Sequence, residues 1–65
     1  MKNKIRSMRT ERNWSQEDMA QKLGVSRQTV NAIENDKYDP MLPLAYKIAK
    51  AFGKRIEDVF QLEER

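Results

Sequence analysis

Two signals for the start of a helix follow each other closely in the middle of this 65-residue chain. At the first signal, Ser15 can cap a helix while Asp18, three residues later, can return the hydrogen bond. At the second, Ser26 repeats the capping position, and Gly24 before it can end the preceding helix in a left-handed conformation. Two short helices must therefore share a turn of about three residues. A turn this tight does not allow antiparallel packing in register, so the two helices are expected to cross steeply.

The apolar residues elsewhere recur at helical spacing and almost never alternate, which predicts an all-α fold. In the first predicted helix, Ile5 and Met8 are one turn apart and are expected to face the core. The chain is predicted to form five helices, at about residues 3–12, 15–23, 26–35, 43–52 and 56–61. The two central helices and their turn have the arrangement that is typical of helix-turn-helix units.

The composition excludes several classes of function. The chain has no Cys and no His, so it lacks disulfides, thiolate nucleophiles, the two commonest zinc ligands and the usual general base. The sequence also shows no pairing of a nucleophile with a base and no Gly-rich phosphate loop. We therefore expect no enzymatic activity, no metal site and no cofactor.

The charge balance is mildly basic, with 13 Lys and Arg against 10 Asp and Glu, a formal net charge of +3 at pH 7. This excess permits nucleic-acid binding without establishing it, and it is concentrated near the N-terminus. No stretch resembles the apolar run of a signal peptide or a membrane span. We expect a cytoplasmic protein without membrane contact.

The outward face of the predicted helix at 26–35 carries residue types that read DNA. With Val30 and Ile33 turned inward, the helical period points Gln28, Asn31 and Ala32 away from the core and puts Arg27 on the flank at the N-terminal end. Gln and Asn can pair with adenine through two hydrogen bonds, and Arg can do so with guanine. This face carries no acid and no Lys, although a merely solvated surface would also be polar.

The residues of this region carry a family resemblance. The run SQEDMAQKLGVSRQTVNAIEN at 15–35, followed by LAYKIAKAFG and IEDVF, resembles the phage Cro/cI repressor-like (Xre) family of transcriptional regulators. The resemblance extends over about residues 5–60. It implies that residues 1–65 form one compact, five-helix, lambda-repressor-like DNA-binding domain, with the helix-turn-helix motif at about 16–35 on the second and third helices.

The resemblance implies a role for each residue that matches the family pattern. Arg27, Gln28 and Asn31 match positions that read bases in the major groove of double-stranded DNA. The side chains expected to contact the DNA backbone are Gln16, Ser26, Asn35, Lys37 and Tyr38. The Tyr38 phenol could alternatively just cover its loop.

Other matching positions concern stability. The resemblance pairs Arg9 with Glu34 in a structural ion pair, and removal of either partner should strand the other charge. Two positions depart from the family pattern, because Met41 and Arg55 stand where Ser or Thr commonly caps the fourth and fifth helices. These two helices are expected to have weaker starts.

A domain this small makes few contacts with DNA, so we expect a homodimer that binds a palindromic operator and acts as a repressor. The expected dimer interface lies at the C-terminal end, at Val59, Phe60 and Leu62. Alternatively, Val59 and Phe60 complete the core of the single chain. The alternative function is a protein-interaction or antitoxin-like module of the same fold with weak or no DNA binding. A second regulatory protein would then be its partner.

Overall fold

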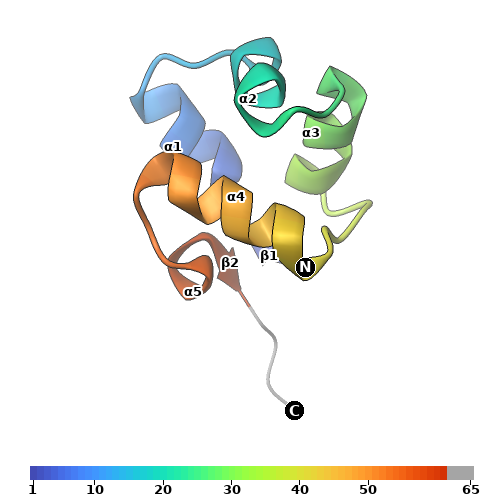
Figure 1. The fold of residues 1–65 in the computed structure, drawn as a ribbon, viewed down its shortest axis with the longest axis vertical. Helices are drawn as coiled ribbons and strands as arrows, with labels where there is room; N and C mark the ends of the chain where they lie inside the picture. The colour runs from blue at the N-terminus through green and yellow to red at the C-terminus, as the bar shows by residue number, and fades with distance from the viewer. Residues whose placement is uncertain (62–65) are drawn as a thin grey trace.

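The computed structural model describes residues 1–61 and is built mainly from short helices (Figure 1). In chain order the elements are β1 (Lys2–Asn3), α1 (Ile5–Glu11), α2 (Gln16–Leu23), α3 (Arg27–Glu34), α4 (Leu42–Phe52), α5 (Ile56–Val59) and β2 (Phe60–Gln61). The predicted five-helix fold is confirmed. A small two-stranded sheet, which the sequence analysis did not predict, is added to it.

The turn between α2 and α3 forms as the sequence predicts. Ser15 accepts a hydrogen bond from the Asp18 backbone N–H at 2.9 Å, and the Asp18 carboxylate accepts one from the Ser15 N–H at 2.8 Å. Gly24 ends α2 with a φ of 73°, a conformation that side chains with a Cβ rarely adopt. The Ser26 hydroxyl then caps α3 by accepting from the Thr29 N–H at 3.1 Å. Three residues thus separate the two helices.

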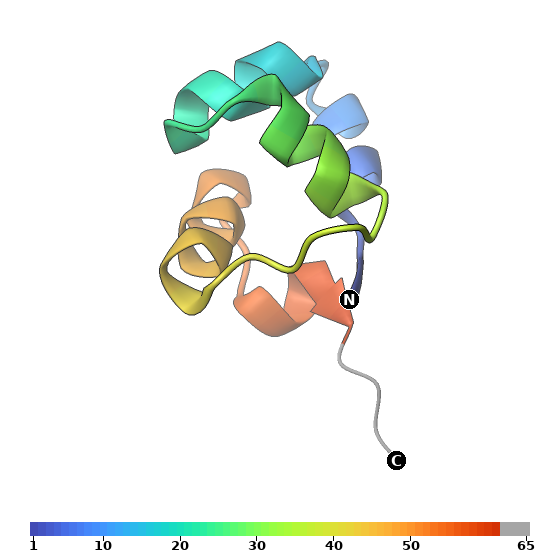
Figure 2. The same cartoon turned by 90° about the vertical axis from the view of Figure 1, so that its right-hand side faces the viewer.

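The helices enclose one core, and this leaves α3 on the outside of the molecule. In Figure 2, α3 lies toward the viewer beside α2, and the connection that follows it crosses to α4. The buried apolar side chains are Ile5, Met19, Ala20, Leu23, Val30, Ile33, Ala45, Ile48, Ala49, Phe52, Val59 and Phe60. Every helix and β2 contribute to this set, so the position of α3 is fixed by packing from the whole chain.

The small sheet changes both ends of the predicted helical pattern. β1 and β2 are antiparallel, with Lys2 opposite Gln61 and Asn3 opposite Phe60. The predictions that the first helix begins at about Asn3 and that the fifth extends to about Gln61 were therefore wrong. The Asn3 side chain instead accepts a hydrogen bond from the Ile5 N–H at 3.1 Å, where α1 begins. A strand of two residues is too short to show an alternating pattern, so the local sequence does not reveal it.

The same sheet gives Val59 and Phe60, two residues of the expected dimer interface, a different role. Val59 and Phe60 have exposed fractions of 0 % and 2 % within the single chain, so they complete its own core and present no surface to a second copy. The Lys4 N–H donates to the Val59 carbonyl at 2.8 Å, which holds the end of α5 over that core. Leu62, the third residue expected at the interface, lies outside the described residues.

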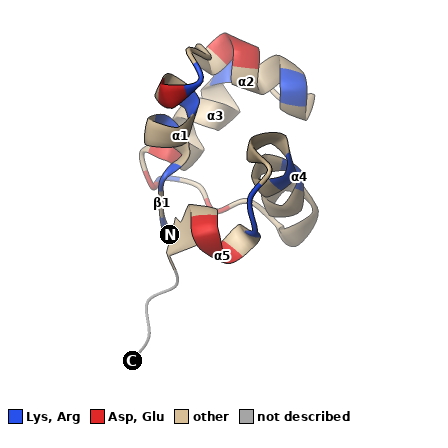
Figure 3. Ribbon diagram, turned by 90° about the vertical axis from the view of Figure 1, so that its left-hand side faces the viewer, with Lys and Arg blue, Asp and Glu red and all other residues tan. Residues whose placement is uncertain are grey.

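The two helices with unusual caps begin in different ways. At α5 the Asp58 carboxylate accepts hydrogen bonds from the Arg55 backbone N–H at 3.1 Å and from its Nε at 3.3 Å. Figure 3 shows this acidic turn of α5 next to the basic connection that leads into it. The hydrogen bonds from Arg55 hold the pKa of Asp58 below its ordinary value. At α4, no side chain within residues 1–61 caps the helix at Met41, and Pro43 in the first turn supports the start instead.

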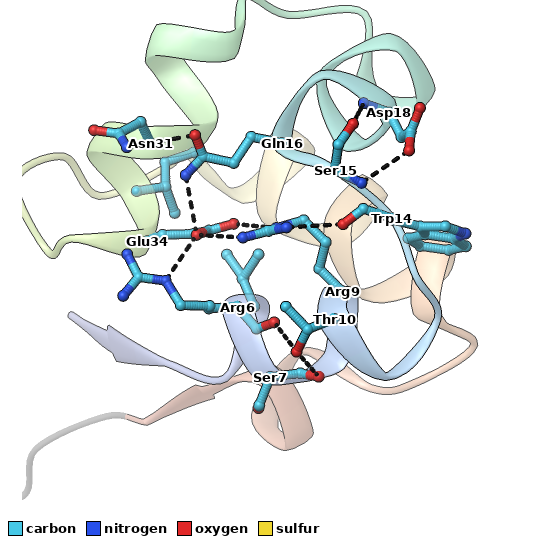
Figure 4. Close-up of polar contacts among 12 residues, drawn as sticks. Arg6, Ser7, Arg9, Thr10, Trp14, Ser15, Gln16, Asp18, Asn31 and Glu34 are labelled. Carbon is cyan, nitrogen blue, oxygen red and sulfur yellow. Dashed lines mark hydrogen bonds and ion pairs between the residues drawn. The ribbon is translucent and has the colours of Figure 1, made fainter.

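A buried ion pair fastens α1 to the end of α3. Arg9, one turn after Ile5, lies on the inward face of α1, and its Nε is 2.8 Å from Oε2 of Glu34. A second guanidinium nitrogen, Nη2, donates to Oε1 of Glu34 at 3.2 Å, and Nη1 donates to the Trp14 carbonyl at 2.8 Å. The Glu34 side chain has an exposed fraction of 0 %. Figure 4 shows its carboxylate pointing toward Arg9. The expected pair is thus present, and it is buried.

The surroundings of Glu34 favour its charged form. Burial alone would raise the pKa of the Glu34 carboxyl. Hydrogen bonds from Arg9, Gln16 and Arg6 and the positive charge of Arg9 outweigh burial, so the net pKa is below the ordinary value. The folded state therefore holds Glu34 as a carboxylate.

We predict that Glu34→Ala lowers the free energy of unfolding by about 3–5 kcal/mol at neutral pH, because it strands the Arg9 guanidinium inside the protein. Urea unfolding monitored by circular dichroism measures this change. Glu11→Ala is the control, since Glu11 is an exposed acid on α1 and its removal should change stability by less than about 0.5 kcal/mol. Equal effects of the two substitutions would contradict a buried structural pair.

The lowered pKa of Glu34 also predicts a dependence on pH. A carboxyl whose pKa is lower in the folded state stabilises the fold above its unfolded pKa, about 4.3 for Glu. That stabilisation is lost as the pH falls through the lower, folded pKa. The stability difference between the wild type and Glu34→Gln should therefore be constant near neutral pH and shrink below about pH 4. A difference that stays constant down to pH 2.5 would show that Glu34 does not titrate in this way.

Candidate nucleic-acid interface

The outward face of α3 presents the three expected base-reading residues together. Arg27, Gln28 and Asn31 are all exposed and lie in the first two turns of the helix, while Val30 and Ile33 are buried on the opposite side. The N-terminal part of such a helix is the part that can reach base edges in a major groove. The structure thus places these three side chains where the helical period predicted.

This face lacks acidic side chains because the fold turns the only acid of α3 inward. Glu34 is the last residue of α3, and its carboxylate points away from solvent toward Arg9. An exposed carboxylate at this position would repel phosphate groups. Burial of Glu34 therefore serves the electrostatics of the surface as well as the stability of the fold.

Gln16, expected at the DNA backbone, lies at the first position of α2 and is half-buried beside α3. Its Nε2 donates to Oε1 of Glu34 at 3.2 Å, and its Oε1 is 3.5 Å from Nδ2 of Asn31 (Figure 4). The first N–H groups of a helix have no partner within the helix, so the start of α2 can also offer backbone donors to an anion. Gln16 therefore links an expected base-reading residue to the buried ion pair.

Ser26 lies at the start of α3, and its exposed hydroxyl is already used within the protein. It caps α3, and its Oγ is 2.9 Å from the Thr29 hydroxyl oxygen. A phosphate contact by Ser26 would have to share this oxygen or use the neighbouring backbone N–H.

The connection after α3 carries the other three expected backbone contacts, which are all exposed: Asn35, Lys37 and Tyr38. The same connection contains two acids, Asp36 and Asp39, which would weaken attraction to phosphate. Both carboxylates accept hydrogen bonds from the N-terminal ammonium of Met1, at 2.7 Å for Asp39. This contact offsets acidic charge next to Lys37.

The sequence analysis missed Arg6. This exposed residue donates from Nε to Oε1 of Glu34 at 3.3 Å and from Nη2 to Oδ1 of Asn35 at 3.1 Å. It precedes Arg9 by three residues, so the two side chains share a face of α1. That spacing is a signal in the sequence, but it does not reveal that Arg6 reaches the end of α3.

None of the helices within residues 1–61 has the length and apolar character that a bilayer crossing would require.

Comparisons with known proteins agree with this geometry. A family model described as helix-turn-helix matches residues 5–59. An uncharacterized HTH-type transcriptional regulator of Methanocaldococcus jannaschii is 61 % identical over 64 residues, covering 98 % of this chain and 97 % of the relative. The HTH-type regulator YgzD of Bacillus subtilis is 53 % identical with the same coverage. The cryptic phage CTXphi transcriptional repressor RstR of Vibrio cholerae is 38 % identical over 86 % of this chain and 50 % of its own length.

The fold is also similar to a solved structure. The crystal structure of the hypothetical transcription factor NHTF from Neisseria superposes with a TM-score of 0.76 at 31 % identity, covering 83 % of this chain and 62 % of that one. The matched families are transcriptional regulators and not enzymes. The chain belongs to the Xre, Cro/cI-like family of helix-turn-helix transcriptional regulators.

Proposed function

We propose that this protein is a sequence-specific regulator that binds a palindromic operator in double-stranded DNA as a homodimer and represses transcription. The observation that carries the proposal is the exposed, acid-free face of α3, where Arg27, Gln28 and Asn31 project side by side from the first two turns. These side chains can form paired hydrogen bonds with guanine or adenine in a major groove. They are therefore the residues that discriminate between sequences.

The side chains around this face fix the protein on the duplex. Gln16 and the start of α2 contact one stretch of DNA backbone, and Ser26 lies at the start of α3. Asn35, Lys37 and Tyr38 contact a second stretch from the connection after α3. Contacts of this kind set the register of the recognition helix but carry no sequence information themselves.

The need for a second copy follows from the size of the reading surface. α3 has eight residues and is about 12 Å long, so one helix reaches only a few base pairs. A symmetric dimer places two such helices about 34 Å apart on successive major-groove turns. The operator is then palindromic because the protein pair is symmetric.

We place the contact between the two copies on the outer face of α4. Leu42 and Tyr46 are one turn apart there, with exposed fractions of 70 % and 56 %. Large apolar side chains that remain exposed together commonly mark a protein contact. A second copy is the occupant that the need for two reading helices calls for.

Repression is the simplest mode of action for a DNA-binding domain, because occupancy of promoter DNA alone can block transcription. The name of one relative, a phage transcriptional repressor, supports this mode.

We predict steeply salt-dependent DNA binding, in which log K falls against log [salt] with a slope of about −0.9 for each phosphate neutralised.

The duplex is obtained by selection from random DNA, which should enrich a palindrome. Gln28→Ala should reduce discrimination at one base pair per half-site by about 1–3 kcal/mol. Gln61→Ala, which removes an exposed Gln on β2, should leave binding unchanged.

The protein-interaction alternative makes the opposite prediction for the same measurements. It expects no enriched sequence at low salt and no effect of Gln28→Ala. That result would contradict the proposed function and favour a module that binds a second regulatory protein.

We predict that Leu42→Glu converts the dimer to monomers in sedimentation experiments while the melting temperature of the domain stays close to that of the wild type. Glu is compatible with the first turn of a helix, so α4 itself should persist. Val59→Ala should do the reverse: it should destabilise the fold by about 2 kcal/mol without weakening dimerisation. Retention of the dimer by Leu42→Glu would contradict the α4 contact, and a monomeric wild type on DNA would contradict the homodimer.

A further inference from the structure

A closed circuit of side-chain hydrogen bonds connects α1, α2 and α3 at the edge of the recognition face. Arg6 Nη2 donates to Asn35 Oδ1 at 3.1 Å, and Asn35 Nδ2 donates to Asn31 Oδ1 at 3.1 Å. Asn31 Nδ2 faces Gln16 Oε1 at 3.5 Å, and Gln16 Nε2 donates to Glu34 Oε1 at 3.2 Å. Arg6 Nε closes the circuit on the same Glu34 oxygen at 3.3 Å. We call these five side chains the amide circuit.

The two charged members give the amide circuit a direction. The Arg6 guanidinium can only donate and the Glu34 carboxylate can only accept, so each amide between them must accept on one side and donate on the other. A rotation of the Asn31 amide alone by 180° would bring two oxygens together at Gln16 and two NH2 groups together at Asn35. The circuit therefore selects one of the two orientations of the Asn31 amide.

The selected orientation leaves Asn31 able to bind a base. An amide NH2 has two hydrogens and a carbonyl oxygen has two lone pairs, and the circuit uses one of each. One N–H and one lone pair remain, which is the set that adenine requires at N7 and at its N6 amino group. Guanine presents two acceptors at the same edge and cannot satisfy the Asn31 carbonyl.

The stronger support of Asn31 comes from the Arg6 side. The contact between Asn31 and Gln16 is 3.5 Å long, at the limit of a hydrogen bond, whereas both links that lead from Arg6 through Asn35 to Asn31 are 3.1 Å. Asn35 is also held by its Nδ2, which donates to the Asn31 backbone carbonyl at 3.0 Å. Loss of the guanidinium would free the Asn35 oxygen and weaken the better-supported side of the circuit.

We infer that Arg6 is a positioning residue for base recognition: it acts through Asn35 to present the Asn31 amide in the orientation that selects adenine over guanine. This inference rests on the proposed function, since it assigns a base to one of its reading residues. Arg6 itself touches no base in this scheme. Its effect is on discrimination at a single base pair of each half-site.

The competing role for an exposed Arg near DNA is a simple phosphate contact, and Arg6→Lys separates the two. Lys keeps the positive charge but lacks the planar fork that reaches Asn35 and Glu34 together. If Arg6 positions Asn31, the Arg6→Lys variant should prefer adenine about fivefold less strongly than the wild type does, at an unchanged salt slope. A fivefold change is about the lower end of what one bidentate contact contributes. If Arg6 only contacts a phosphate, the Arg6→Lys variant should keep the full preference for adenine.

The experiment measures dissociation constants for the selected duplex and for duplexes changed at each half-site position. The variants are Arg6→Lys, Asn31→Ala, the two combined, and Lys4→Met as a control that removes an exposed charge from the segment just before α1. We expect Arg6→Lys to reduce discrimination only at the base pair where Asn31→Ala does, with no further loss in the combined variant. Equal losses at all positions, or additive losses, would overturn the inference.

A measurement without DNA keeps this test separate from the proposed function. The side-chain amide of Asn31 gives a pair of NMR signals in the free protein, which should report an ordered group in the wild type and a mobile one in Arg6→Lys. An Asn31 amide that is equally mobile in both proteins would overturn the positioning role even if DNA binding is specific. A wild type that prefers no base would overturn the adenine assignment together with the proposed function.

Discussion

The rest of this structure depends on one buried carboxylate. Glu34 closes α3 with no exposed side-chain surface, and a charge in that position is tolerable only with partners that compensate for the loss of water. Arg9 and Arg6 of α1 and Gln16 of α2 supply them. Because these donors come from two other helices, the requirement to satisfy one charge constrains how three helices meet, in addition to the packing of the core.

The same carboxylate connects stability to the reading face. With Glu34 turned inward, the exposed side of α3 keeps Arg27, Gln28 and Asn31 and no acid. The amide circuit connects Glu34 to Asn31 at the surface, through Arg6 and Asn35 on the better-supported side and through Gln16 on the other. In the function that we propose, the Glu34 carboxylate therefore has two roles. It holds the three helices together, and it anchors the hydrogen bonds that orient the Asn31 amide toward a base. Such support from rigid elements is what a precise recognition site requires.

The small sheet affects what the short length of the chain implies about a dimer. A domain of this size has little core, and the sequence analysis expected Val59 and Phe60 either to contact a second copy or to complete the core of the single chain. Pairing between β1 and β2 folds the end of α5 over the chain's own core, so both side chains are already buried. The reason for a dimer in our proposal is therefore the reach needed along DNA and not missing core area.

The sequence by itself determined the elements whose signals are local. The capping pair of Ser15 and Asp18, the left-handed Gly24 and the inward pair of Val30 and Ile33 predicted the helix-turn-helix unit and the face on which Arg27, Gln28 and Asn31 lie, because caps and helical period act within a few residues. Only the tertiary structure decided the partners that lie far apart along the chain. The two-residue strands, the burial of Val59 and the contacts of Arg6 with Glu34 and Asn35 have no local pattern, since each depends on where a distant segment packs.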